Sequence, residues 1–73
     1  MRLEYFPETD TLYIHLRDGP GADAKEVAPD VVVDLDAEGQ AIGIEIEHAS
    51  TRTDVTKLHW SSAFHPLQSA ASP

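Results

Sequence analysis

The sequence predicts a mainly β protein: a small antiparallel sheet of four or five strands in two hairpins, with a short C-terminal helix or strand. An α+β class is the alternative. Two observations predict this fold. Apolar and polar residues alternate with a period of two, which is typical of half-buried strands, and four-residue stretches of turn formers separate two pairs of such segments, as in hairpins. The length of 73 residues allows one domain, expected at residues 1–60, with a flexible tail at residues 61–73.

The first predicted hairpin closes through Pro7–Asp10, a segment of turn-forming residues. Pairing Tyr5 with Leu12 also brings Leu3 opposite Ile14. This register collects the apolar side chains of both strands on one face, because side chains alternate between the two faces of a sheet.

The second predicted hairpin lies in residues 31–47, VVVDLDAEGQAIGIEIE, with its turn at Ala37–Gln40. One register pairs the apolar residues across this turn on a single buried face. Pattern and turn chemistry therefore agree in both hairpins, which favours the fold. The predicted pairs are Leu35 with Ile42, Val33 with Ile44, and Val31 with Ile46.

The remaining segments give weaker signals. Residues 18–21 predict a loop, residues 25–27 a brief edge strand, and residues 48–52 a short helical turn. Residues 54–60 alternate and are rich in strand-forming types, which favours a strand. A short helix capped by Asp54 is the alternative for this segment.

Composition narrows the classes of function. Asp and Glu number 13 against 5 Lys and Arg, so the formal net charge is −8 and any electrostatically chosen partner is expected to be basic. Such a surface repels phosphate backbones, and we expect no nucleic-acid binding. No apolar run approaches the roughly 20 residues that span a bilayer, so we expect no membrane association and a cytoplasmic protein. A chain this short has a small core and no cysteine to staple it, so we expect a homodimer.

Three segments together resemble one family of small prokaryotic proteins. They are YFPETDTLYIHL at residues 5–16, VVVDLD at residues 31–36 and GIEI at residues 43–46. Their pattern is similar to that of domain-of-unknown-function family 2283, over about residues 3–50. The chain departs from the pattern at Phe6-Pro7, where the family often has an Asp.

The resemblance implies little chemistry. The family has no established activity, and no catalytic residues come with it. Some members lie beside genes for small toxin-like proteins, so the resemblance implies an antitoxin-like or accessory role.

The sharpest motif is a calcium-type spacing in the second hairpin. Carboxylates at the first, third, fifth and twelfth positions, with a glycine at the sixth, fit the ligand set of a calcium loop. The flanking segments are strands, however, and alternation plus a glycine turn produces the same spacing. The candidate ligands are Asp34, Asp36, Glu38 and Glu45.

The carboxylates also suggest acid–base chemistry, with Asp34, Asp36, Glu45 and Glu47 expected on one solvent-facing side. The predicted register puts Asp34 near Glu45, so like-charge repulsion is expected to raise one pKa. Four histidines, at positions 15, 48, 59 and 65, lack the close spacing of a zinc motif within the chain; a composite site across a dimer is the alternative.

Three apolar residues are expected on the outer face and three more in the C-terminal segment. The outer set forms an exposed strip of the kind that marks an interface. Alternatively, the C-terminal set covers it within the same chain, or exchanges between two chains. The residues are Phe6, Tyr13 and Val32, with Leu58, Trp60 and Phe64.

The sequence thus predicts a non-enzymatic protein-interaction module without a cofactor, an antitoxin-like or accessory partner of a small basic protein. The alternative is a carboxylate-face, calcium-type metal-binding protein or a small enzyme.

Overall fold

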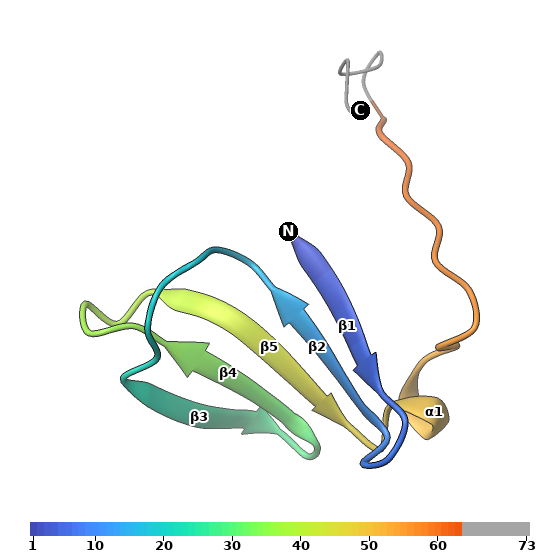
Figure 1. Cartoon of the computed structure of the whole chain (residues 1–73), viewed down its shortest axis with the longest axis horizontal. Coiled ribbons are helices and arrows are strands. Elements are labelled where there is room, and N and C mark those ends of the chain that lie inside the picture. Colours follow the sequence, from blue (N-terminus) through green and yellow to red (C-terminus); the bar gives the residue numbers. More distant parts are fainter. Residues whose placement is uncertain (64–73) are drawn as a thin grey trace.

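A computed structural model describes residues 1–63 of the chain. Five strands form one antiparallel sheet in the order β1-β2-β5-β4-β3, and one short helix follows them (Figure 1). The mainly β fold class is confirmed. The elements are β1 (Arg2–Phe6), β2 (Thr11–His15), β3 (Asp23–Ala28), β4 (Val31–Leu35), β5 (Ala41–Glu47) and α1 (Ala49–Arg52).

The β1–β2 hairpin has the predicted register. Tyr5 pairs with Leu12, and Leu3 pairs with Ile14. The turn at residues 7–10 ends on Asp10, whose φ of 53° is left-handed. Asp is among the few residue types that adopt this conformation readily, so the sequence suits the turn.

The β4–β5 hairpin confirms two predicted pairs and corrects the third. Val33 pairs with Ile44 and Val31 with Ile46, but Leu35 lies opposite Ala41 instead of Ile42. Ile42 is the extra residue of a β-bulge. The turn explains the shift, because its hydrogen bond from the Asp36 N–H to the Gln40 carbonyl (2.9 Å) closes the hairpin ahead of Ala41.

The sheet joins the two hairpins through β2 and β5. Leu12 pairs with Ile46 and Ile14 with Ile44, so β5 is the central strand of the five. The connection from β2 to β3 passes over the end of β5 and β4 (Figure 1). Its start is fixed there by hydrogen bonds from the Leu16 and Arg17 N–H groups to the Ile42 carbonyl (2.9 and 3.3 Å). The edge strand β3 is longer than the predicted residues 25–27.

The segment after β5 forms the expected helical turn, α1, but the predicted strand at residues 54–60 is wrong. Asp54 instead makes a local turn, accepting hydrogen bonds at Oδ1 from the Thr56 N–H (3.0 Å) and hydroxyl (2.6 Å). These local bonds compete with strand formation. No helix begins at Val55 either, and residues 57–63 have no regular secondary structure. The rest of the predicted tail, including Phe64, lies outside the described residues.

The sheet is a single layer, and its apolar side chains meet on one side of it. Within residues 1–63 only Ile42 and Ala49 are buried apolar residues, with 6% and 0% of their surfaces exposed. None of the described helices is long and apolar enough to cross a membrane. We call the apolar side of the sheet the apolar face. By register it carries Leu3, Tyr5, Leu12, Ile14, Val31, Val33, Leu35, Ile44 and Ile46.

Candidate functional site

The other side of the sheet gathers ionisable side chains of all five strands. Cross-strand pairs place these residues in neighbouring rows, because directly opposed residues point to the same face. We call this side the acidic face. By register it carries Arg2, Glu4, Phe6, Thr11, Tyr13, His15, Ala24, Glu26, Val32, Asp34, Gly43, Glu45 and Glu47.

Tyr13 and Gly43 organise the centre of the acidic face. Gly43 lies opposite His15 on β2 and Asp34 on β4. The Tyr13 ring occupies the space above it: a Cβ added to Gly43 would lie 2.6 Å from Cζ of Tyr13 and 2.7 Å from Cε1. Glycine at this position therefore lets the Tyr13 side chain reach across β5 towards β4.

The Tyr13 side chain makes a hydrogen bond to β4. Its hydroxyl donates to Oδ2 of Asp34 at 2.5 Å. This bond, followed by partial burial and the charges of Asp34 and Glu45, raises the pKa of Tyr13 to about 12. The phenol is therefore a fixed hydrogen-bond donor at neutral pH.

Asp34 and Glu45 are neighbouring carboxylates beside this tyrosine. Partial burial is the largest cause that raises the pKa of Glu45. The charge of Asp34, a hydrogen bond that protonated Glu45 makes with Asp34, and the charge of Glu47 raise it further. The direction of this shift agrees with the predicted repulsion between Asp34 and Glu45, although burial is its largest cause. A cation beside the pair would relieve this repulsion.

A second polar group lies at the β1 side of the acidic face. Nε2 of His15 is 2.9 Å from Oε1 of Glu4, and Nη1 of Arg2 is 3.0 Å from the same oxygen. The hydrogen bond from His15 lowers the pKa of Glu4 most, ahead of the charge of Arg2. The His15 ring also contacts Tyr13, with centroids 4.3 Å apart. Glu4 is thus already neutralised within the chain.

The structure divides the predicted calcium ligands. Asp34 and Glu45 lie on the acidic face, whereas Asp36 and Glu38 lie in the β4–β5 turn. Oδ1 of Asp36 accepts the N–H groups of Glu38 (3.0 Å) and Gln40 (2.8 Å), so it serves to close the turn. Among residues 1–63 no group of three or more His, Asp or Glu side chains is placed to hold a metal ion.

The predicted interface residues lie apart. Phe6 is 41% exposed, but Glu45 stands between Tyr13 and Val32, opposite both of them in register. The apolar strip on this face is therefore interrupted by a carboxylate. Leu58 and Trp60 are about three-quarters exposed, at 75% and 73%, so neither of them covers it.

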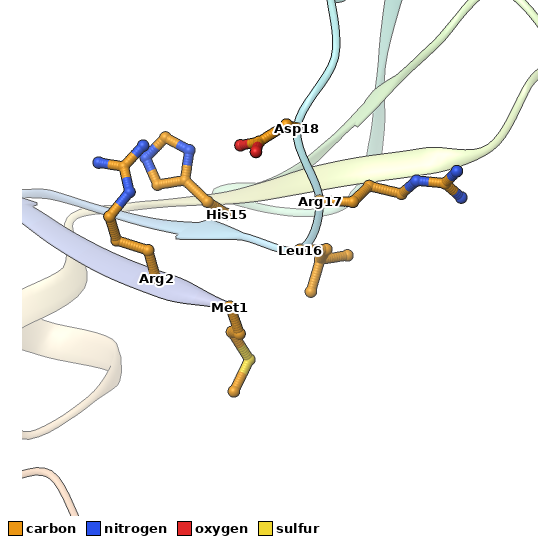
Figure 2. A pocket seen from close by; sticks show the side chains of 6 residues that line it. All are labelled: Met1, Arg2, His15, Leu16, Arg17 and Asp18. Carbon is orange, nitrogen blue, oxygen red and sulfur yellow. The ribbon is translucent and has the colours of Figure 1, made fainter. Parts of the chain in front are cut away.

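A shallow depression lies at the ends of β1 and β2, but its side chains diverge. Met1 and Leu16 point to one side of the sheet, whereas Arg2, His15 and Asp18 point to the other (Figure 2). Arg17, the remaining lining residue, points away (Figure 2). The depression does not bring these groups together for binding or catalysis.

Asp10 is an organising residue that the sequence analysis missed. It accepts hydrogen bonds from the Tyr5 hydroxyl (2.6 Å), the Ser50 N–H (3.0 Å) and the Ser50 hydroxyl (2.7 Å). Its carbonyl accepts the Ala49 N–H (2.9 Å). Asp10 therefore caps α1 from the first hairpin. Its place at the end of a turn, where Asp tolerates positive φ, was the available signal.

Asp30 holds the other side of α1. Its Oδ2 is 3.2 Å from Nδ1 of His48 and 3.1 Å from Nη2 of Arg52. Burial tends to raise the pKa of Asp30, but the hydrogen bonds from His48 and Arg52 outweigh it and lower the pKa. These contacts are structural, because they join the β3–β4 turn to the helix.

The acidic face is therefore an open sheet surface on which Tyr13 bonds to Asp34 beside Glu45, with no enclosing wall within the described residues. Sites for small substrates are usually concave. The comparisons agree with the resemblance in the strand segments: the model of a family described as "Protein of unknown function (DUF2283)" matches residues 2–50. Searches of curated proteins and of solved structures found no match. The chain belongs to the DUF2283 family of proteins of unknown function.

Proposed function

We propose that this protein is a non-enzymatic interaction module whose acidic face binds a basic segment of another protein. One observation carries the proposal: the salt bridges of the described residues use Glu4 and Asp30, leaving Asp34, Glu45 and Glu47 without a cation. Within this acidic set the pKa of Glu45 is raised by burial and then by the charges of Asp34 and Glu47, and a lysine or arginine from a partner would offset the part that comes from these charges.

The open sheet surface of the acidic face supports the same proposal. A sheet surface offers rows of side chains at fixed spacing, and Tyr13 adds a rigid aromatic ring among the acids. Aromatic residues surrounded by polar groups are common at protein interfaces. The finer part of the proposal, a small basic partner for which the chain is an antitoxin-like or accessory subunit, rests on the charge complementarity.

The test uses an oligolysine peptide as the probe. Binding is expected to weaken as sodium chloride rises, because exposed charges are screened. Replacing Glu45 and Glu47 by Gln together is expected to reduce the affinity about threefold or more. The matched control replaces Glu8 and Glu38, which lie in the two hairpin turns, and removes the same charge. It is expected to bind nearly as well as the natural chain.

Equal losses in the two double variants would contradict the proposal, since they would show a response to net charge alone. The same pair of variants then serves in co-purification from native cells. There, a basic partner is expected to be retained by the natural chain and the turn variant and lost by the Glu45/Glu47 variant.

A further inference from the structure

The apolar face is a partly exposed surface that the proposed function does not use. Nine apolar side chains lie on it by register, and none of them is fully buried. Leu3 and Tyr5 at the β1 edge are 38% and 37% exposed. Ile42 is covered, and its Cδ1 lies 4.0 Å from where a Cβ on Gly21 would be. The β2–β3 connection thus covers one end of the sheet only.

The described part of the C-terminal segment, residues 53–63, does not cover the face. Residues 53–63 run away from the sheet after α1 (Figure 1), and Leu58 and Trp60 in that segment are largely exposed. Residues 64–73 contain two large apolar residues, Phe64 and Leu67. Two such side chains are too few to cover nine.

The charge of the apolar face fits a second copy of the same chain. The formal net charge of the chain is −8, but the charged residues that share this face by register are Asp23, opposite Leu35, and Lys25, opposite Val33. These two charges cancel and lie on the edge strand. A face that meets its own copy must avoid net charge, whereas a face selected for a basic partner would carry acids, as the opposite side does.

The area is also adequate. Five strands spaced about 4.8 Å apart, each about 17 Å long, present roughly 400 Å² of projected surface, and projecting side chains increase the accessible area. Two copies together would bury on the order of 1,000 Å², which reaches the range of specific interfaces. Two identical sheets also share one twist, so they can pack in the aligned arrangement of β-sandwiches.

We infer that two copies pack apolar face to apolar face as a two-fold β-sandwich. The central strand β5 of one copy lies over β5 of its partner, with Ile44 near the two-fold axis, because β5 is central in the strand order. The acidic faces then point outward on opposite sides, separated by two sheet layers about 10 Å apart. This separation, close to a Debye length at physiological salt, keeps their repulsion weak. The inference does not depend on a basic partner.

The test begins with the natural full-length chain. Sedimentation equilibrium is expected to give twice the chain mass of 8.0 kDa, and the thermal midpoint is expected to rise with protein concentration, since association is coupled to stability. A soluble paramagnetic agent is expected to leave the methyl signals of Ile44 and Val33 sharp and to broaden those of Val32 on the acidic face.

Matched variants assign the face. Ile44→Lys is expected to weaken association more than tenfold, whereas Val32→Lys, which changes a half-buried residue of the opposite face, is expected to leave the dimer intact. A folded natural chain with monomer mass and a concentration-independent midpoint would overturn the inference. A dimer in which the paramagnetic agent broadens the Ile44 and Val33 methyl signals would also overturn it. This measurement uses the natural chain, so it remains valid even if Ile44→Lys does not fold. Oligolysine binding by a monomer would overturn the sandwich and leave the proposed function standing.

Discussion

The two faces of the sheet are built from the same strands and solve different problems. On the apolar face, branched side chains from neighbouring strands pair in register, Val33 with Ile44 and Ile14 with Ile44. On the acidic face the same rows are occupied by groups that need specific partners, as in the bond from Tyr13 to Asp34. The difference teaches that the alternating sequence encodes an apolar surface and a polar, hydrogen-bonded surface within a single layer.

The largest expected effect compares alanine truncations of one branched aliphatic residue on each face. Ile44→Ala is expected to lower the free energy of unfolding by about 3 kcal/mol per chain, because the inferred dimer covers Ile44 and removing a large aliphatic side chain from a covered site costs about 2–5 kcal/mol. Val32→Ala, on the acidic face, is expected to cost about 1 kcal/mol or less. Urea unfolding at fixed protein concentration measures both. Equal costs would mean that the two faces are equally exposed in solution.

The second prediction concerns Gly43. Gly43→Ala is expected to cost about 1–2 kcal/mol, because the new Cβ displaces the Tyr13 ring and breaks its bond to Asp34. In a Tyr13→Ala background the same change is expected to be neutral or slightly stabilising, since nothing remains to be displaced and glycine is a poor strand former. A double-mutant cycle by urea unfolding gives the coupling. A cycle without coupling would show that the ring does not occupy this space.

Gly43 also shows which parts of the structure can be predicted from the sequence. Alternation and turn residues predict the strands and most of the register, because both depend on neighbours along the chain. The position of β2 beside β5 depends on contacts between distant segments, so no local pattern contains it. The cluster of Tyr13, Asp34 and Glu45 follows from that position. A glycine inside an otherwise branched strand was the one local sign of a close approach.

Two local errors have a related cause. Ile42 was expected opposite Leu35, but side-chain and main-chain hydrogen bonds of Asp36 set the turn and leave Ile42 in a bulge. Asp54 likewise starts a turn through its own side chain where alternation favoured a strand. In both places a short polar side chain bonds to nearby backbone, and the spacing of hydrophobic residues carries no information about such bonds.

The third prediction tests the cap that joins the first hairpin to α1. Asp10→Ala is expected to lower the urea midpoint and speed amide exchange in α1, because it removes the acceptor for Tyr5 and Ser50 and places alanine at positive φ. Asp10→Asn is expected to lose less, since asparagine tolerates that backbone and keeps one acceptor oxygen. An alanine variant with unchanged exchange in α1 would contradict the capping role.

The smallest expected effect is a pH dependence that separates the acidic face from the rest of the molecule. Folding raises the pKa of Glu45, so between the ordinary glutamate value and the raised value the folded state binds more protons than the unfolded state. Stability contributed by this group therefore falls as pH rises through that window. Folding lowers the pKa of Glu4, Asp10 and Asp30, so their contribution is lost in the opposite direction, as pH falls through the lowered values.

Glu45→Gln removes the pH dependence that comes from Glu45 and keeps the one that comes from Glu4, Asp10 and Asp30. The variant is expected to be more stable than the natural chain at pH 7 and equal to it near pH 4, where Glu45 is protonated in both states. Thermal unfolding across this range at constant ionic strength measures the difference. Glu47→Gln removes the same charge from the same strand and is expected to gain less, because Glu47 contributes the last and smallest of the causes that raise the pKa of Glu45. If both variants gained equally, the gain would come from net charge, and the repelling pair would have no special place on this face.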